Sequence, residues 1–90
     1  MKFINIGFSN MISAERIVAL ASPDSAPIKR LIGQSTEGGR LIDCTCGKKT
    51  KSVLIMDSDH VILSALPPET LSERISGEAD SEDETSEVPS

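Results

Sequence analysis

The chain has 90 residues and a formal net charge of −5 at pH 7, and 38% of its residues are hydrophobic. This length allows one domain with a small core, and such chains often gain further stability from self-association. The sequence has no run of about 18 apolar residues and no N-terminal secretory signal, so we expect a soluble cytoplasmic protein without a membrane span.

The charges are unevenly distributed along the chain. Residues 1–76 contain all nine Lys and Arg together with eight acids, whereas residues 77–90 contain six acids and no base. The second segment has Val88 as its one large apolar residue, so it cannot bury enough surface to offset the entropy of ordering. The sequence therefore predicts a folded domain over residues 1–76 and a disordered acidic tail over residues 77–90.

The N-terminal part of the domain contains two strand candidates. Residues 3–8 are mostly apolar, and Ser9-Asn10 after them is a natural turn. Residues 16–21 form a second apolar run that could also be a buried helix. Because the run is short and Pro23 ends it, the pattern favours a strand.

A helix is expected after the second strand. Ser25 is a suitable N-cap, Pro27 falls in the first turn where its missing N–H does no harm, and Gly38-Gly39 supply a stop. Three apolar residues between these signals have helical spacing and predict one buried stripe. The stripe consists of Ile28, Leu31 and Ile32.

The strongest strand signal lies in residues 53–56 and 61–63. The polar residues 57–60 between them have the length of a hairpin loop, so the two runs should pair antiparallel. Residues 41–46 alternate only partly, and Gly47 then opens a turn. These features predict a three-stranded meander with a cluster of cations at one tip. The cluster consists of Lys48, Lys49 and Lys51.

Pro67-Pro68 break the last strand, and residues 69–75 can form a short helix. The predicted fold class is therefore α+β, with a mainly antiparallel sheet, one central helix and a short C-terminal helix. Residues 53–56 and 61–63 are apolar on both faces of the sheet, and the central helix covers one of them. We expect a second copy of the chain to cover the other face, which makes a homo-oligomer the favoured state.

Few side chains in the sequence could hold a metal or perform chemistry. Cys44 and Cys46 would lie about 7 Å apart on a strand, which is too far for a disulfide, and two thiols are at most half of a zinc site. Packing residues of a reducing compartment are favoured, with redox or metal chemistry left open. His60 with Asp57 and Asp59 could suggest a metal or acid–base site, but their spacing is that of a polar turn and no fourth ligand is evident, so a structural turn is favoured. No nucleophile–base pair is present, so we expect no enzyme activity, cofactor or metal.

Longer runs allow a comparison with known families. The runs are Phe3–Phe8 (FINIGF), Ser22–Arg30 (SPDSAPIKR), Leu41–Asp43 (LID), Ile55–Ala65 (IMDSDHVILSA) and Pro68–Thr70 (PET). They resemble RemA, the extracellular matrix regulatory protein family of spore-forming bacteria, over about residues 3–75. The resemblance implies a DNA-binding transcriptional regulator of extracellular matrix and biofilm genes that assembles into a ring-shaped homo-oligomer.

The resemblance also implies which residues contact DNA. In this family an arginine before the second strand and a pair of arginines in the basic turn have this role. Arg16 matches the first, Lys48 and Lys49 occupy the places of the pair, and Lys51 adds a further cation. Lysine keeps the charge but lacks the planar fork of arginine. The family usually has alanine and tyrosine at the positions of Cys44 and Cys46, so an aromatic neighbour of the basic turn is missing in this chain.

Other interpretations of the same residues stay open. Taken alone, the three lysines fit a solvated turn, and Arg16 fits an ion pair with a nearby acid. The ring could also be a structural adaptor that binds protein partners and not DNA, or the cysteines could act as a thiol sensor. The acidic tail could mimic DNA and compete for the basic residues, or it could simply solvate the assembly.

Overall fold

The computed structural model describes residues 2–77, and these form an α+β fold with two α-helices, as predicted. In chain order the elements are β1 (Phe3–Asn5), β2 (Met11–Ser13), the 3-10 helix η1 (Ala14–Arg16), β3 (Ile17–Ala21), α1 (Ala26–Glu37), β4 (Leu41–Asp43), β5 (Ser52–Met56), β6 (Val61–Ser64) and α2 (Pro68–Ser76). The acidic tail predicted from residue 77 onward lies outside the described residues, apart from Gly77, which caps α2.

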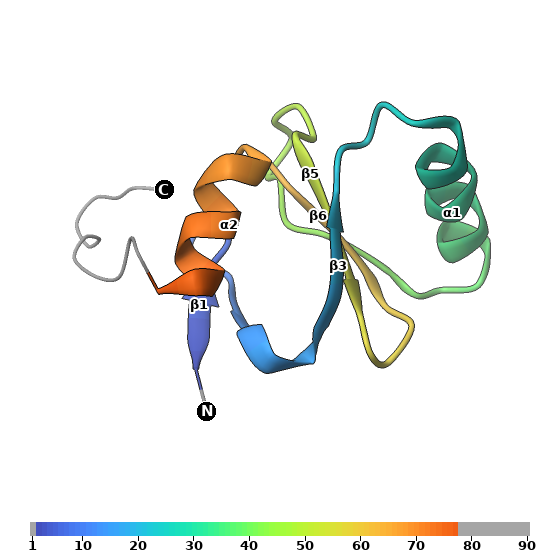
Figure 1. Cartoon of the computed structure of the whole chain (residues 1–90). Helices are drawn as coiled ribbons and strands as arrows, with labels where there is room; N and C mark the ends of the chain where they lie inside the picture. The colour runs from blue at the N-terminus through green and yellow to red at the C-terminus, as the bar shows by residue number, and fades with distance from the viewer. Residues whose placement is uncertain (1, 78–90) are drawn as a thin grey trace.

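The strands form two sheets. β1 and β2 make an antiparallel hairpin, and the other four strands form one sheet in the order β3-β5-β6-β4. β5 pairs antiparallel with both β3 and β6, which confirms the predicted pairing of residues 53–56 with residues 61–63. In Figure 1 the four-stranded sheet stands between α1 on one side and α2 with β1 on the other.

The predicted three-stranded meander is wrong at β4. This strand ends at Asp43 and pairs with β6 in parallel, so it lies on the far side of β6 from β5. Residues 44–51 therefore form a connection that passes the end of β6, and not a hairpin turn between neighbouring strands. The connection is longer than the two to five residues typical of hairpins, which is the sequence signal against a meander.

Both helices begin and end near the predicted residues. The Ser25 side chain accepts a hydrogen bond of 3.3 Å from the backbone N–H of Ile28, and the N–H of Gly38 donates to the Gln34 carbonyl at 3.0 Å. These contacts satisfy backbone groups that the helix itself leaves free. The C-terminal helix ends at Gly77 in a left-handed conformation (φ 90°) that glycine adopts without strain.

One face of the four-stranded sheet packs against α1. Val53 and Val61 are almost completely buried there, together with Leu63. The residues of α1 and β4 that cover them are Ile28, Leu31, Ile32 and Leu41. The predicted apolar stripe of the helix is therefore its packing face.

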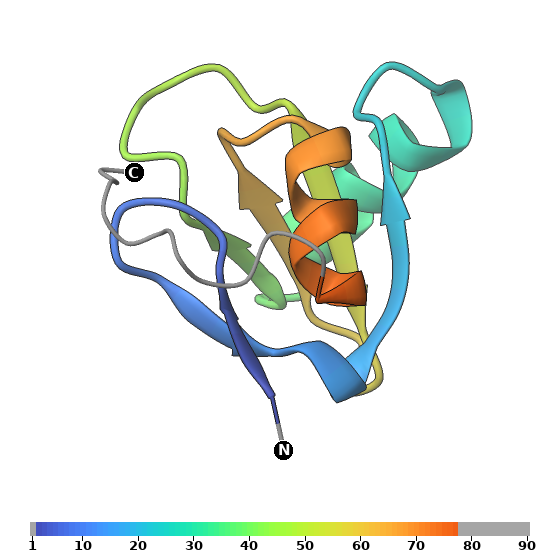
Figure 2. The ribbon, with the colours of Figure 1, turned by 60° about the vertical axis from the view of Figure 1, so that its left-hand side comes forward.

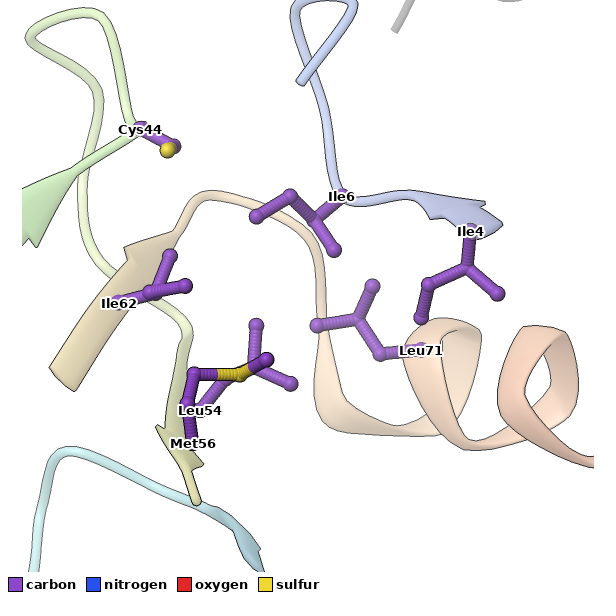
Figure 3. Close-up of a cluster of buried hydrophobic side chains, with 7 residues drawn as sticks. All are labelled: Ile4, Ile6, Cys44, Leu54, Met56, Ile62 and Leu71. Atoms are coloured by element: carbon purple, nitrogen blue, oxygen red, sulfur yellow. The ribbon is translucent and has the colours of Figure 1, made fainter. Parts of the chain in front are cut away.

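The opposite face is covered by the N-terminal hairpin and α2 (Figure 3). The members of this cluster are Ile4, Ile6, Cys44, Leu54, Met56, Ile62 and Leu71. Arg74 Nη1 donates to the Asn5 carbonyl at 2.7 Å, and Ser64 Oγ donates to the Ile6 carbonyl at 2.7 Å, which ties the hairpin to the body. The expectation that a second copy must cover this face is wrong, because the chain covers it itself.

No helix within residues 2–77 is long and apolar enough to cross a membrane.

Removing the Leu54 side chain tests whether this second cluster stabilises the fold. Leu54 is fully buried, so we expect Leu54→Ala to lower the free energy of unfolding by about 2–5 kcal/mol, because apolar burial is reduced and a cavity is left behind. Urea denaturation at several protein concentrations measures this. As a control, Gln34→Ala at an exposed position of α1 should cost less than about 1 kcal/mol. Equal losses in the two variants would contradict the assignment.

Candidate nucleic-acid interface

The three predicted lysines lie on the connection between β4 and β5, which passes the end of β6 at the top of Figure 2. Both ends of this connection are fixed to the sheet. The N–H of Cys44 donates to the Leu63 carbonyl at 3.0 Å, and the N–H of Lys51 donates to the Ser64 carbonyl at 2.8 Å. The lysines are therefore carried by a connection that is anchored to one strand at two points.

A tight turn in the connection positions Lys48. The N–H of Lys48 donates to the Thr45 carbonyl at 3.0 Å, and the two central residues, Cys46 and Gly47, have φ values of 53° and 82°. Two left-handed residues in succession are typical of a type I′ turn, in which glycine is favoured and most other residues are strained. Gly47 thus sets the direction in which the chain enters the lysine segment.

Hydrogen bonds to Asp43 stabilise the start of the same turn. Its carboxylate accepts hydrogen bonds from the Thr45 hydroxyl at 2.6 Å and from the Thr45 N–H at 2.9 Å. These bonds favour the ionised form and lower the pKa of the Asp43 carboxyl group, against a smaller opposing effect of burial. Sequence analysis missed this role, although an aspartate two residues before a threonine is a common local turn pattern.

All three lysine side chains are exposed, and none forms an ion pair with an acid among residues 2–77. A pocket of about 390 Å³ opens beside Lys49 and Lys51, at the start of α2. Asp24 and Glu69 also line this pocket, so its charge is mixed. The three lysine side chains face solvent on an anchored backbone, which allows contact with a large anionic partner.

Arg16 lies away from the lysines. It ends η1 at the start of β3, where Ile17 pairs with Met56, whereas Lys51 precedes the opposite end of β5. Figure 2 shows η1 at the bottom of the sheet and the lysine connection at the top. The β3–β5 ladder between them spans roughly 16 Å at 3.3 Å per residue. A single copy of the chain therefore does not bring Arg16 and the lysines together.

Arg16 instead contacts the turn between β5 and β6. Its Nε lies 3.1 Å from Asp57 Oδ1 and 3.2 Å from Oδ2, and this is the one ion pair among residues 2–77. Glu15 and Asp59 are near neighbours of this pair along the chain. Arg16 thus shares this end of the sheet with acids and with Arg40, whose carbonyl accepts a hydrogen bond from the N–H of Val61.

The two cysteines have different environments. Cys44 is buried in the core, and this burial raises the pKa of its thiol, with the Asp43 charge adding to the effect. A neutral buried thiol is a poor nucleophile. Cys46 is exposed at the turn, so the prediction that both cysteines are packing residues is wrong for Cys46. The assumption that they share a strand is also wrong, because β4 ends at Asp43.

The polar residues 57–60 form the β5–β6 turn, as predicted. The N–H of Asp59 donates to the Met56 carbonyl at 3.0 Å, and Ser58 Oγ lies 2.7 Å from His60 Nδ1. Each side chain that could have suggested a metal or acid–base site thus has a local partner or a turn position. Among the described residues no group of three His, Cys, Asp or Glu could hold a metal ion.

The pKa of Asp43 predicts how the turn responds to acid. A carboxyl group whose pKa is lower in the folded state stabilises that state above its unfolded pKa of about 4, and the contribution is lost as the pH falls through the folded pKa. Between about pH 5 and pH 2 the wild type should therefore lose more stability than Asp43→Asn. Urea denaturation at each pH measures the difference.

The control for this experiment is Thr45→Val, which removes the hydroxyl donor but keeps the backbone N–H. In that background the difference between Asp43 and its Asn variant should shrink. Parallel stability curves for the wild type and Asp43→Asn would contradict a stabilising role of the carboxylate.

Comparisons with known proteins agree with the runs seen in the sequence. Residues 3–75 match the RemA-like family, described as "Extracellular matrix regulatory protein A-like". A protein of Geobacillus kaustophilus named "Putative regulatory protein" is 57% identical over 84 residues, covering 93% of this chain and 97% of the relative. A protein of Carboxydothermus hydrogenoformans with that name is 54% identical over 83 residues, covering 92% and 95%. The family and these names indicate a regulatory protein, and the chain belongs to the RemA-like family.

Proposed function

We propose that this protein is a DNA-binding transcriptional regulator that acts as a homo-oligomeric ring and controls extracellular matrix and biofilm genes. In this proposal Arg16, Lys48, Lys49 and Lys51 contact the phosphate backbone of double-stranded DNA. The family description and the names of the relatives support a regulatory role. A partner of this kind places the protein in the cytoplasm, on the nucleoid.

The observation that carries the proposal is the anchored lysine connection. Three exposed lysines without ion pairs to residues 2–77 follow one another within four positions, on a backbone tied to β6 at both ends. A phosphate that binds there displaces counterions and does not have to break an ion pair within the described domain. Because the backbone is already ordered, less conformational entropy is lost on binding.

Backbone contact fits this surface better than reading of base edges. Lysine binds phosphate as a point charge and lacks the fork that recognises guanine at two positions. Both aromatic residues of the chain, Phe3 and Phe8, lie in the N-terminal hairpin and not beside the lysines. Selectivity would then depend on how easily a DNA sequence bends along the assembly.

Assembly supplies the affinity that one subunit lacks. Three cations contribute modestly, but contacts repeated on linked subunits add through effective concentration. Arg16 and the lysines are at opposite ends of the sheet, so they would contact different phosphates, either of one duplex or through neighbouring subunits. A repeated array of both groups is therefore part of the proposal.

The distribution of exposed apolar side chains supports self-association. Three of them, Phe3, Phe8 and Met11, belong to the N-terminal hairpin, and Val18 and Ile42 lie on the two edge strands β3 and β4. A ring of more than two subunits needs contact between two different surfaces. The outer face of the hairpin and a sheet edge are two such surfaces. Both expose large apolar side chains, and clusters of such side chains on a surface often mark an interaction site.

Charge reversal in the lysine connection tests DNA binding. We expect the double variant Lys48→Glu/Lys49→Glu to bind DNA at least about tenfold more weakly, and the slope of log affinity against log salt to fall by about 0.9 for each phosphate that the variant no longer neutralises. Electrophoretic shift or fluorescence anisotropy across a salt series measures both, with light scattering to confirm that the oligomer mass is unchanged.

The matched control is Lys29→Glu/Arg30→Glu, which reverses two adjacent exposed cations on α1. This variant should retain most of the DNA affinity. If the wild-type protein shows no salt-sensitive DNA binding, the proposed DNA-binding function is wrong, and a structural adaptor that binds protein partners becomes the favoured function. Equal losses in the lysine variant and in the control would indicate a general effect of net charge.

New charges on the apolar surfaces test assembly. Met11→Glu on the hairpin and Val18→Glu on β3, whose side chain is 67% exposed, should each lower the oligomer mass without lowering the far-UV signal of folded protein. Burying an unpaired carboxylate at an interface is costly, whereas it costs little on a solvated surface. Sedimentation or light scattering measures the mass. A wild type that is monomeric at working concentration would contradict ring assembly.

A further inference from the structure

The ion pair of Arg16 with Asp57 is part of a reciprocal contact between η1 and the β5–β6 turn. The backbone N–H of Asp57 donates to the Arg16 carbonyl at 2.9 Å, and Arg16 Nε donates to both carboxylate oxygens at 3.1 and 3.2 Å. The backbone hydrogen bond thus fixes the main chains of the two residues relative to each other, independently of the side-chain contact. The side-chain contact has a defined direction.

The direction of this contact leaves most of the guanidinium group free. Arg16 presents its Nε edge to Asp57, and Nη1 and Nη2 have no hydrogen-bond partner within residues 2–77. The Arg16 side chain is 61% exposed and that of Asp57 is 47% exposed. The outer donors of the planar group are the ones that a phosphate would contact.

The solvent exposure of the pair argues against a mainly stabilising role, because exposed ion pairs contribute little to folding. What the pair does show is a preferred orientation of the Arg16 side chain. A free arginine has many rotamers, and ordering it on binding costs entropy. A carboxylate that holds Nε removes part of that cost.

We infer that Asp57 is a positioning residue, which holds the Nε edge of Arg16 so that Nη1 and Nη2 face a phosphate group. This inference rests on the proposed function, and it assigns a role to an acid that simple charge counting would treat as unfavourable for DNA binding. Asp57 does not contact DNA itself. It acts through the orientation of Arg16.

Asp59 offers a matched control in the same turn. It carries the same charge, it forms no ion pair with Arg16 within the described residues, and its φ of 71° is a conformation that asparagine adopts readily. Asp59→Asn therefore removes one negative charge near Arg16 and leaves its partner in place. Asp57→Ala removes the same charge and also the hydrogen-bond acceptor, while Asp57→Asn removes the charge and keeps one acceptor oxygen.

The experiment measures DNA affinity of the full-length assembled protein across a salt series. Asp59→Asn should bind slightly more tightly than the wild type, since a repulsive charge is gone. Asp57→Ala should bind about threefold or more weakly, with the salt slope reduced by as much as in Arg16→Ala, about 0.9 for one phosphate contact. Asp57→Asn should recover most of the loss. The double variant Arg16→Ala/Asp57→Ala should bind no more weakly than Arg16→Ala alone.

Two results would overturn the inference and leave the proposed function in place. If Asp57→Ala tightens binding as Asp59→Asn does, Asp57 is only a competing charge. If Arg16→Ala binds DNA as tightly as the wild type does while Lys48→Glu/Lys49→Glu does not, Arg16 does not contact a phosphate group, and Asp57 cannot position it for one. Absence of salt-dependent binding by the wild type would instead be the failure of the proposed function. Unchanged oligomer mass and unfolding midpoint confirm that each variant is folded.

Discussion

The central strands β5 and β6 are apolar on both faces, and the rest of the fold follows from the need to cover both. α1 covers Val53 and Val61 on one side, while the hairpin and α2 cover Leu54 and Ile62 on the other. A chain of 90 residues has little material for this, so each covering element is short. Hydrogen bonds from Arg74 and from Ser64 to backbone carbonyls of the hairpin hold that thin layer in place.

Covering both faces also determines where the charges lie. β4 reaches its place beside β6 only after α1 has crossed one face, and the chain must then pass the end of β6 to begin β5. The basic connection is the segment that makes this passage. The opposite end of the sheet carries Arg16 with its acidic neighbours, so the two cationic sites are separated by the full length of β3 and β5. The separation is a result of topology and not of local sequence.

Some of this could be predicted from the sequence, and the physical reasons are local. The start and end of α1 depend on Ser25 and Gly38, and the β5–β6 pair depends on two apolar runs with a short polar loop, so neighbouring residues were enough. The partner of β4 could not be predicted in that way, because its parallel pairing with β6 skips the strand that follows it in the chain, β5. Exposure of the lysines was expected, but their distance from Arg16 depends on the β3–β5 register. The ion pair of Asp57 with Arg16 could not be predicted either, because it joins residues 41 positions apart along the chain.

In the β4–β5 connection, the residues that determine the path of the backbone differ from those that supply the exposed charges. Asp43, Thr45 and Gly47 determine the path of the backbone, whereas the lysine side chains point outward and contribute nothing to that path. Residue types at positions 48, 49 and 51 can therefore be exchanged without redesigning the scaffold. Arginines, aromatic groups or acids could be placed there to change the charge and chemistry of this surface while the framework stays the same.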